Sequence, residues 1–159
     1  MLEHRVLLVC LRTFSSVQTI VDGDSNIVLG YARREARSSP WWRRLLGRSV
    51  WAVREQEDEP LLFTIQRAWG WLPRRCVCDA EGQWVGTLLG RRIHDRRGRL
   101  LATLENGVFR APDHRVLAEL ASTAAGLRLT FSEDVVGEPF VKMLLLAAAL
   151  QVADPGVRR

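Results

Sequence analysis

The middle of this sequence repeats a short turn motif every 16 residues. Asp79-Ala-Glu-Gly82 is followed by Asp95-Arg-Arg-Gly98 and by a degraded copy at Ala111–His114, and apolar residues come after each copy. An Asp side chain can bond the backbone of its own turn, and Gly supplies the positive φ that closes the turn. Two short strands with their turns fill such a period. The repeat therefore predicts a series of antiparallel β-hairpins.

Further strands are predicted outside the repeat, where a looser and longer copy of the motif lies at Asp22–Gly30. Residues 115–125 also fit a helix with Val116, Leu117 and Leu120 on one face, but the repeat favours a strand for the first half of this segment. Small residues such as Gly86 are expected where a strand bends or another backbone comes close. The other predicted strands are His4–Leu11, Ser16–Val21, Ile27–Arg33, Ser49–Arg54, Leu61–Arg67 and Leu127–Phe131.

The last apolar stretch predicts a helix over about 139–153. Pro139 suits the first turn of a helix, and Phe140–Val152 is apolar on nearly every side. Such a helix must be buried all round, which a curled or closed sheet of hairpins would achieve. The 159 residues suffice for one domain and are too few for two. We therefore expect a single, mainly β domain over residues 1–159, a closed antiparallel barrel that encloses the C-terminal helix.

These features resemble the tubby C-terminal-like superfamily, and within it the phospholipid scramblase and LURP-one-related branch. The resemblance implies a tubby-like barrel of about twelve strands around the hydrophobic helix. Tubby proteins bind phosphoinositides through basic surface residues, and scramblases are calcium-responsive membrane proteins. The proline-rich region and the cysteine cluster of eukaryotic scramblases are missing, and Ser132-Glu133-Asp134 matches their acidic calcium loop poorly. The resemblance is carried by Ile27–Ala32, Leu62–Gln66, Val77–Gly86 and Lys142–Asp154.

The basic residues are 22 Arg and one Lys, Lys142, and the net charge is +5. Many Arg lie in three stretches: a basic insert at about 34–48, which we expect to be irregular, a predicted loop at 69–75, and a hairpin turn at 91–99. Trp favours the headgroup level of a bilayer and Arg pairs with phosphate, so the insert suits a membrane surface; equally, its Trp pair can pack on the barrel beside solvated Arg. The candidate lipid- or anion-binding residues are Arg33, Arg34, Arg37, Trp41, Trp42, Arg43, Arg44, Arg74 and Arg75.

Catalytic signatures are missing from the sequence. There is no Gly-rich phosphate loop, no Gly-x-Ser-x-Gly elbow and no paired His and Cys. We therefore expect no enzyme activity, no cofactor and no metal site. Three Cys without Cys-x-x-Cys spacing indicate a reducing compartment, and the apolar runs are too short to span a bilayer. A cytoplasmic protein is expected, and lipid binding would place it peripherally at the inner face of the membrane.

The sequence thus predicts a non-catalytic module that contacts anionic phospholipid or a membrane surface. The alternative is a protein-interaction scaffold of the same fold with no lipid role, in which Trp side chains anchor a protein partner. Arg interleaved with aromatic residues also permits nucleic-acid binding, but no recognition module is present, so this partner is not favoured. The sequence does not specify an oligomeric state.

Overall fold

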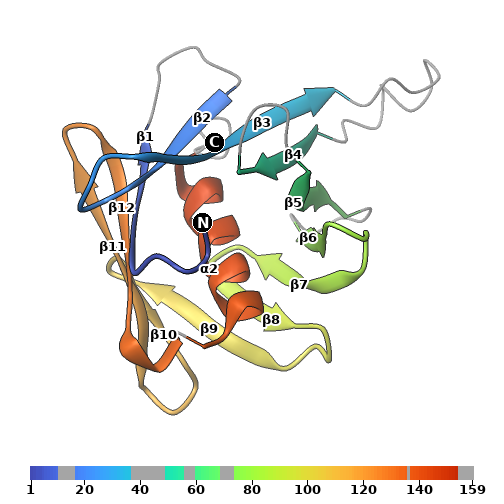
Figure 1. Ribbon diagram of the computed structural model, residues 1–159. Helices are drawn as coiled ribbons and strands as arrows, with labels where there is room; N and C mark the ends of the chain where they lie inside the picture. The colour runs from blue at the N-terminus through green and yellow to red at the C-terminus, as the bar shows by residue number, and fades with distance from the viewer. Residues whose placement is uncertain (11–16, 37–48, 56–59, 69–73, 136, 154–159) are drawn as a thin grey trace.

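The computed structural model describes residues 1–10, 17–36, 49–55, 60–68, 74–135 and 137–153. Within these ranges, twelve antiparallel strands form a closed barrel in which each strand pairs with its neighbours in sequence and β1 pairs with β12 (Figure 1). The predicted fold class is therefore confirmed. The strands are β1 (Val6–Cys10), β2 (Val17–Asp22), β3 (Val28–Ala36), β4 (Ser49–Arg54), β5 (Leu61–Arg67), β6 (Arg74–Asp79), β7 (Trp84–Leu89), β8 (Arg92–Asp95), β9 (Leu100–Glu105), β10 (Val108–Arg110), β11 (Val116–Thr123) and β12 (Gly126–Phe131).

The hairpin turns form at the repeated motif. The side chain of Asp79 accepts a hydrogen bond from the backbone N–H of Gln83 at 2.7 Å, and that of Asp95 accepts from the N–H of Arg97 at 2.8 Å. Gly82 and Gly98 close these turns with φ of 79° and 76°. In the degraded third copy, His114 takes the positive φ instead. The local chemistry of Asp and Gly thus accounts for the meander.

One expectation about strands is confirmed and another is corrected. Residues 115–125 form a strand and not the alternative helix, as the repeat favoured for the first half: β11 runs from Val116 to Thr123 and pairs with β10 and β12. The predicted irregular insert starts too early, because Arg34–Ala36 continue β3 and pair with β4 up to the partners Ala36 and Ser49. In both segments, pairing with a neighbouring strand determines where the strand lies, and local sequence patterns do not report this pairing.

Helix α2 (Pro139–Ala153) passes through the middle of the barrel (Figure 1), with the bounds predicted from the sequence. The side chains of its middle turns are buried on all sides: Leu145 and Leu146 are completely inaccessible, and Leu144 is nearly so. The barrel contributes large buried residues to the same core, among them Phe63 and Phe109. Between β12 and α2 lies a short 3-10 helix, η1 (Glu133–Val135). Burial of apolar surface from both the helix and the sheet stabilises the fold.

Because the strands are antiparallel, alternate turns lie at the same end of the barrel. The turns after Asp22, Asp79 and Asp95 lie at the end where α2 begins, together with residues 1–5. The β7–β8, β9–β10 and β11–β12 turns lie at the end where α2 finishes. These two ends carry very different charge.

Candidate functional site: an arginine-rich end of the barrel

Seven Arg in the described part of the chain lie toward the end of the barrel where α2 finishes, and we call this set the arginine end. Arg67 on β5 pairs directly with Arg75 on β6, while Arg74 and Arg92 both pair with Leu89 on the strand between them. The acidic residues at this end, among those that the structure describes, are Glu35, Glu105 and Glu119, and the last two both pair with Val108. The arginine end consists of Arg33, Arg34, Arg67, Arg74, Arg75, Arg91 and Arg92.

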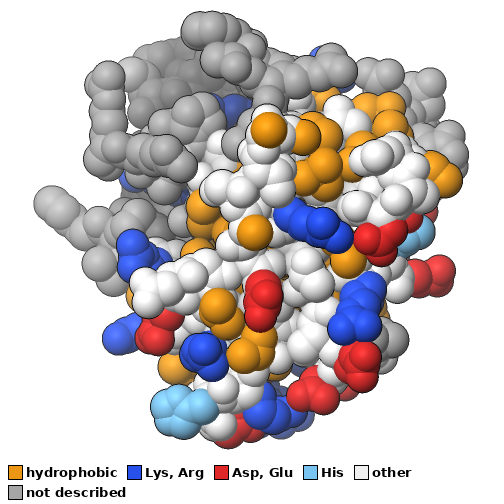
Figure 2. Space-filling model, turned by 90° about the vertical axis from the view of Figure 1, so that its left-hand side faces the viewer, with side chains coloured by type: hydrophobic (Ala, Val, Ile, Leu, Met, Phe, Trp, Pro, Cys, Tyr) orange, Lys and Arg blue, Asp and Glu red, His pale blue; other side chains and the backbone are white. Residues whose placement is uncertain are grey.

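The opposite end, which we call the acidic end, carries most of the described carboxylates. Its Arg side chains are largely engaged with them: Arg5 with Glu133 at 3.2 Å, and Arg115 with Asp113 at 2.7 Å. Figure 2 shows acidic and basic side chains lying next to one another on the face that carries β10–β12. The acidic residues of this end are Glu3, Asp22, Asp24, Glu55, Asp79, Glu81, Asp95, Asp113, Glu133, Asp134 and Glu138.

The arginine end lacks such internal compensation. Within the described ranges, no carboxylate forms an ion pair with Arg33, Arg34, Arg67, Arg91 or Arg92, and all five side chains are exposed. A guanidinium presents a planar fork of N–H donors that fits phosphate or carboxylate oxygens in a bidentate arrangement. These side chains are therefore free of competing carboxylates in the described structure and can take up an external anion.

The structure separates the sequence candidates into three groups. Arg33 and Arg34 lie on β3, and Arg74 and Arg75 begin β6 rather than lying in the predicted loop, because they pair with β7. These four belong to the arginine end. The remaining candidates, Arg37, Trp41, Trp42, Arg43 and Arg44, lie outside the described residues.

The predicted basic turn at 91–99 is divided between the two ends of the barrel. Arg91 lies in the turn before β8 and Arg92 begins this strand, whereas Arg96, Arg97 and Arg99 follow its last residue, Asp95. Arg99 is engaged with Asp95 at 2.8 Å. Sequence reasoning missed Arg67, which joins the site only through its pairing with Arg75. The alternation of turns along a meander would have revealed which turns share an end.

A pocket of about 470 Å³ opens at the arginine end, between the β7–β8 and β9–β10 hairpins and the last turns of α2. Its polar residues include Arg91 and Gln151, and the amide oxygen of Gln151 is buried without a hydrogen-bond donor among the described residues. The sequence offered no signal for this pocket, since its walls come from three distant segments. Its apolar lining is Leu88, Ile93, Leu104, Phe109, Ala148 and Val152.

Other kinds of site find little support in the described ranges. No cluster of three or more His, Cys, Asp or Glu there is arranged to hold a metal ion, and the three Cys are unpaired thiols. Burial raises the pKa of the Cys78 thiol, which disfavours the reactive thiolate. No helix in this part of the chain has the length and apolar content required to cross a membrane.

Fold and site together define a closed antiparallel β-barrel around a central helix, with five exposed Arg at one end that have no carboxylate partner among the described residues. Comparison with protein-family models, with curated proteins and with solved structures finds no match for this chain.

Proposed function

We propose that this chain is a non-catalytic, tubby-like module of the scramblase and LURP-one-related type that contacts anionic phospholipid through its arginine end. One observation carries the proposal: the exposed Arg of this end have no carboxylate partners among the described residues, whereas most Arg at the acidic end do. The twelve-stranded barrel around a central helix is the architecture that the family resemblance implies, which supports this reading.

The distribution of charge suits a planar anionic surface. A membrane that meets the arginine end lies far from the carboxylates of the acidic end, so their repulsion is weak and is screened within about 10 Å. Each Arg near an anionic leaflet contributes about 1 kcal/mol. Five exposed Arg are therefore enough for reversible peripheral binding, which we place at the cytoplasmic face of the membrane.

Vesicle co-sedimentation tests this function. The wild type should bind vesicles that contain phosphatidylserine and leave phosphatidylcholine vesicles unbound. The triple variant Arg33→Ala, Arg67→Ala and Arg92→Ala removes about 3 kcal/mol of attraction, or roughly 100-fold in affinity. None of these three residues lines the pocket.

The matched control removes three Arg of the acidic end, Arg96, Arg97 and Arg110, which form no ion pair with a described carboxylate. This variant has the same net charge as the test variant and should keep most of the binding. Equal binding to phosphatidylcholine vesicles, or equal losses in the two triple variants, would refute a lipid contact through the arginine end.

A protein-interaction scaffold is the second candidate, and exposed aromatic residues at the acidic end favour it. Trp84 and Phe140 are 43% and 54% exposed and line a pocket of about 370 Å³ with Val141 and Leu144. Exposed aromatic side chains beside a pocket are typical anchors for a protein partner. The scaffold function would be favoured over the lipid contact by two results together. A protein partner binds the wild type but neither Trp84→Ser nor Phe140→Ser, and none of these three proteins binds vesicles.

A further inference from the structure

The pocket at the arginine end lies beside a turn of the central helix that carries only small side chains. Leu144–Leu146 fill the barrel with large side chains, but the next turn is Ala147–Ala149, whose side chains are single methyl groups. Ala148 lines the pocket, and Val152 at the end of the helix is 36% exposed at its mouth. The space between helix and sheet therefore opens toward the same end of the barrel as the unpaired Arg.

The walls of this pocket are hydrocarbon. Leu88, Ile93 and Phe109 are at most 1% exposed, so this part of the wall belongs to the barrel core. Its volume of about 470 Å³ lies in the range of small-molecule sites, about 300–1,000 Å³. Each methylene group of a ligand buried here gains about 0.8 kcal/mol. The lining thus favours an alkyl chain.

Two polar groups distinguish the pocket from a simple packing defect. Arg91 contributes a cation, and it has no carboxylate partner among the described residues. The amide oxygen of Gln151 is buried and has no hydrogen-bond donor among the described residues. A ligand with an alkyl chain and an anionic head matches the apolar lining and the Arg91 cation.

We propose that this pocket receives one acyl chain of an anionic phospholipid, with the phosphate held by Arg91. The inference rests on the proposed function, because the same membrane that meets the arginine end supplies the lipid. The protein then makes more than an electrostatic contact with the membrane. It draws one acyl chain of a single lipid out of the bilayer and holds it between the helix and the barrel.

Dodecyl phosphate at concentrations below its micelle threshold is the probe, titrated into the full chain by calorimetry, with inorganic phosphate as the comparison. The wild type should bind dodecyl phosphate at least about tenfold more tightly, because only this ligand fills the apolar space. Val152→Trp, which occupies the mouth, and Ala148→Leu, which occupies the interior, should each weaken binding by about tenfold or more. Two variants are used so that a failure of one to fold leaves the other.

Phe140→Trp is the matched control, an exposed position on the same helix at the acidic end, and it should bind like the wild type. Arg91→Ala should weaken dodecyl phosphate about fivefold, the loss of roughly one favourable charge. If Phe140→Trp weakens the binding of dodecyl phosphate and Val152→Trp does not, the ligand binds elsewhere and the inference is overturned.

The remaining outcomes separate the pocket from the lipid contact. If phosphatidylserine vesicles bind the wild type but dodecyl phosphate does not, or binds Val152→Trp and Ala148→Leu equally well, the pocket inference is overturned and the proposed function stands. If neither vesicles nor dodecyl phosphate bind, both fail. Similar affinities for dodecyl phosphate and inorganic phosphate would leave Arg91 as an anion contact and exclude the acyl chain.

Discussion

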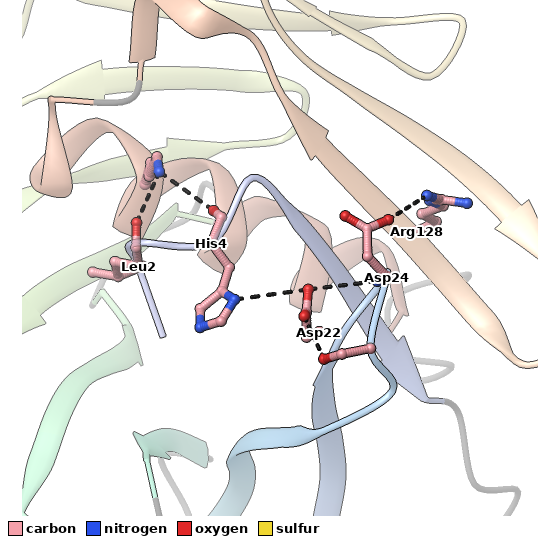
Figure 3. Close-up of polar contacts among 7 residues, drawn as sticks. Leu2, His4, Asp22, Asp24 and Arg128 are labelled. Carbon is pink, nitrogen blue, oxygen red and sulfur yellow. Dashed lines mark hydrogen bonds and ion pairs between the residues drawn. The ribbon is translucent and has the colours of Figure 1, made fainter.

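The side-chain nitrogen of Lys142, inside the barrel, donates a hydrogen bond to the backbone carbonyl of Leu2 at 2.8 Å (Figure 3). A second bond reaches the carbonyl of His4 at 3.3 Å, and the same nitrogen lies 5.2 Å from the centre of the Phe131 ring. The side chain is completely buried, so the only lysine of the chain fastens the N-terminal segment to the central helix.

Burial should make Lys142 titrate below the usual lysine value. Desolvation lowers its pKa from 10.5, and the negative charge of Glu3 opposes this only in part. Because the sequence contains one lysine, selective isotope labelling of lysine gives a single NMR signal. The midpoint of its pH titration gives the pKa of Lys142 directly. A midpoint at or above 10.5 would contradict the buried geometry.

The same shift predicts how stability depends on pH. Between the folded pKa of Lys142 and 10.5, the unfolded chain binds more protons than the folded one, so the contribution of this residue to stability increases as pH rises. Urea unfolding of the wild type and of Lys142→Met across this window measures the effect. The increase should be missing from Lys142→Met, and a difference between the two proteins that stays constant with pH would refute it.

A methyl group at Gly86 should destabilise the barrel by about 1–3 kcal/mol. A Cβ atom there would collide with the carbonyl oxygen of His94 on β8 and lie 2.9 Å from a terminal carbon of Leu144 on the helix. Gly137→Ala is the control, because nothing lies within 4 Å of its added carbon. Thermal unfolding should show a clear loss for Gly86→Ala and almost none for Gly137→Ala.

Asp95→Asn should cost about 1 kcal/mol or less at neutral pH. The Asn side chain can still accept from the backbone of the turn, but its interaction with the Arg99 guanidinium, 2.8 Å away in the wild type, loses its charge. The control is Asp79→Asn, the same turn position one hairpin earlier, where the described contact is the backbone N–H of Gln83.

The loss caused by Asp95→Asn should disappear in acid. Burial opposes ionisation of Asp95, yet hydrogen bonds from the Arg99 side chain and from the backbone of Arg99 and Arg97 hold its pKa below 3.8. The contribution of this carboxylate is therefore complete above 3.8 and is lost as pH falls through the folded pKa. Unfolding curves recorded from neutral pH downward should converge for the two proteins, and a gap that widens in acid would contradict this assignment.

Leu145→Ala should lower stability by about 2–5 kcal/mol. Leu145 is completely inaccessible in the middle of α2, where the surrounding barrel leaves little room for collapse around the missing atoms. Phe140→Ala removes a larger side chain from the same helix at a position that is 54% exposed, so its cost should be much smaller. Comparable losses for the two variants in urea unfolding would show that the helix is not enclosed as described.

The parts of this fold that local chemistry decides were predictable from the sequence. Asp95 and Gly98 specify a turn by themselves, and Phe140–Val152 is apolar on nearly every side, which requires enclosure. The site depends on which strands lie side by side. Arg67 and Arg75 are eight positions apart and become partners only through the register of β5 and β6, and the pocket joins three distant segments. Neither relationship leaves a periodic trace in the sequence.

Closure of the barrel pairs Val6 on β1 with Thr130 on β12, and the helix that fills the interior follows both in the chain. During synthesis, all twelve strands leave the ribosome before the helix that covers their apolar inner face. Contacts this distant in sequence form slowly, and uncovered strands are prone to aggregate. Until the helix has been synthesised, the apolar inner face of the sheet therefore has no cover from the element that fills it in the folded protein.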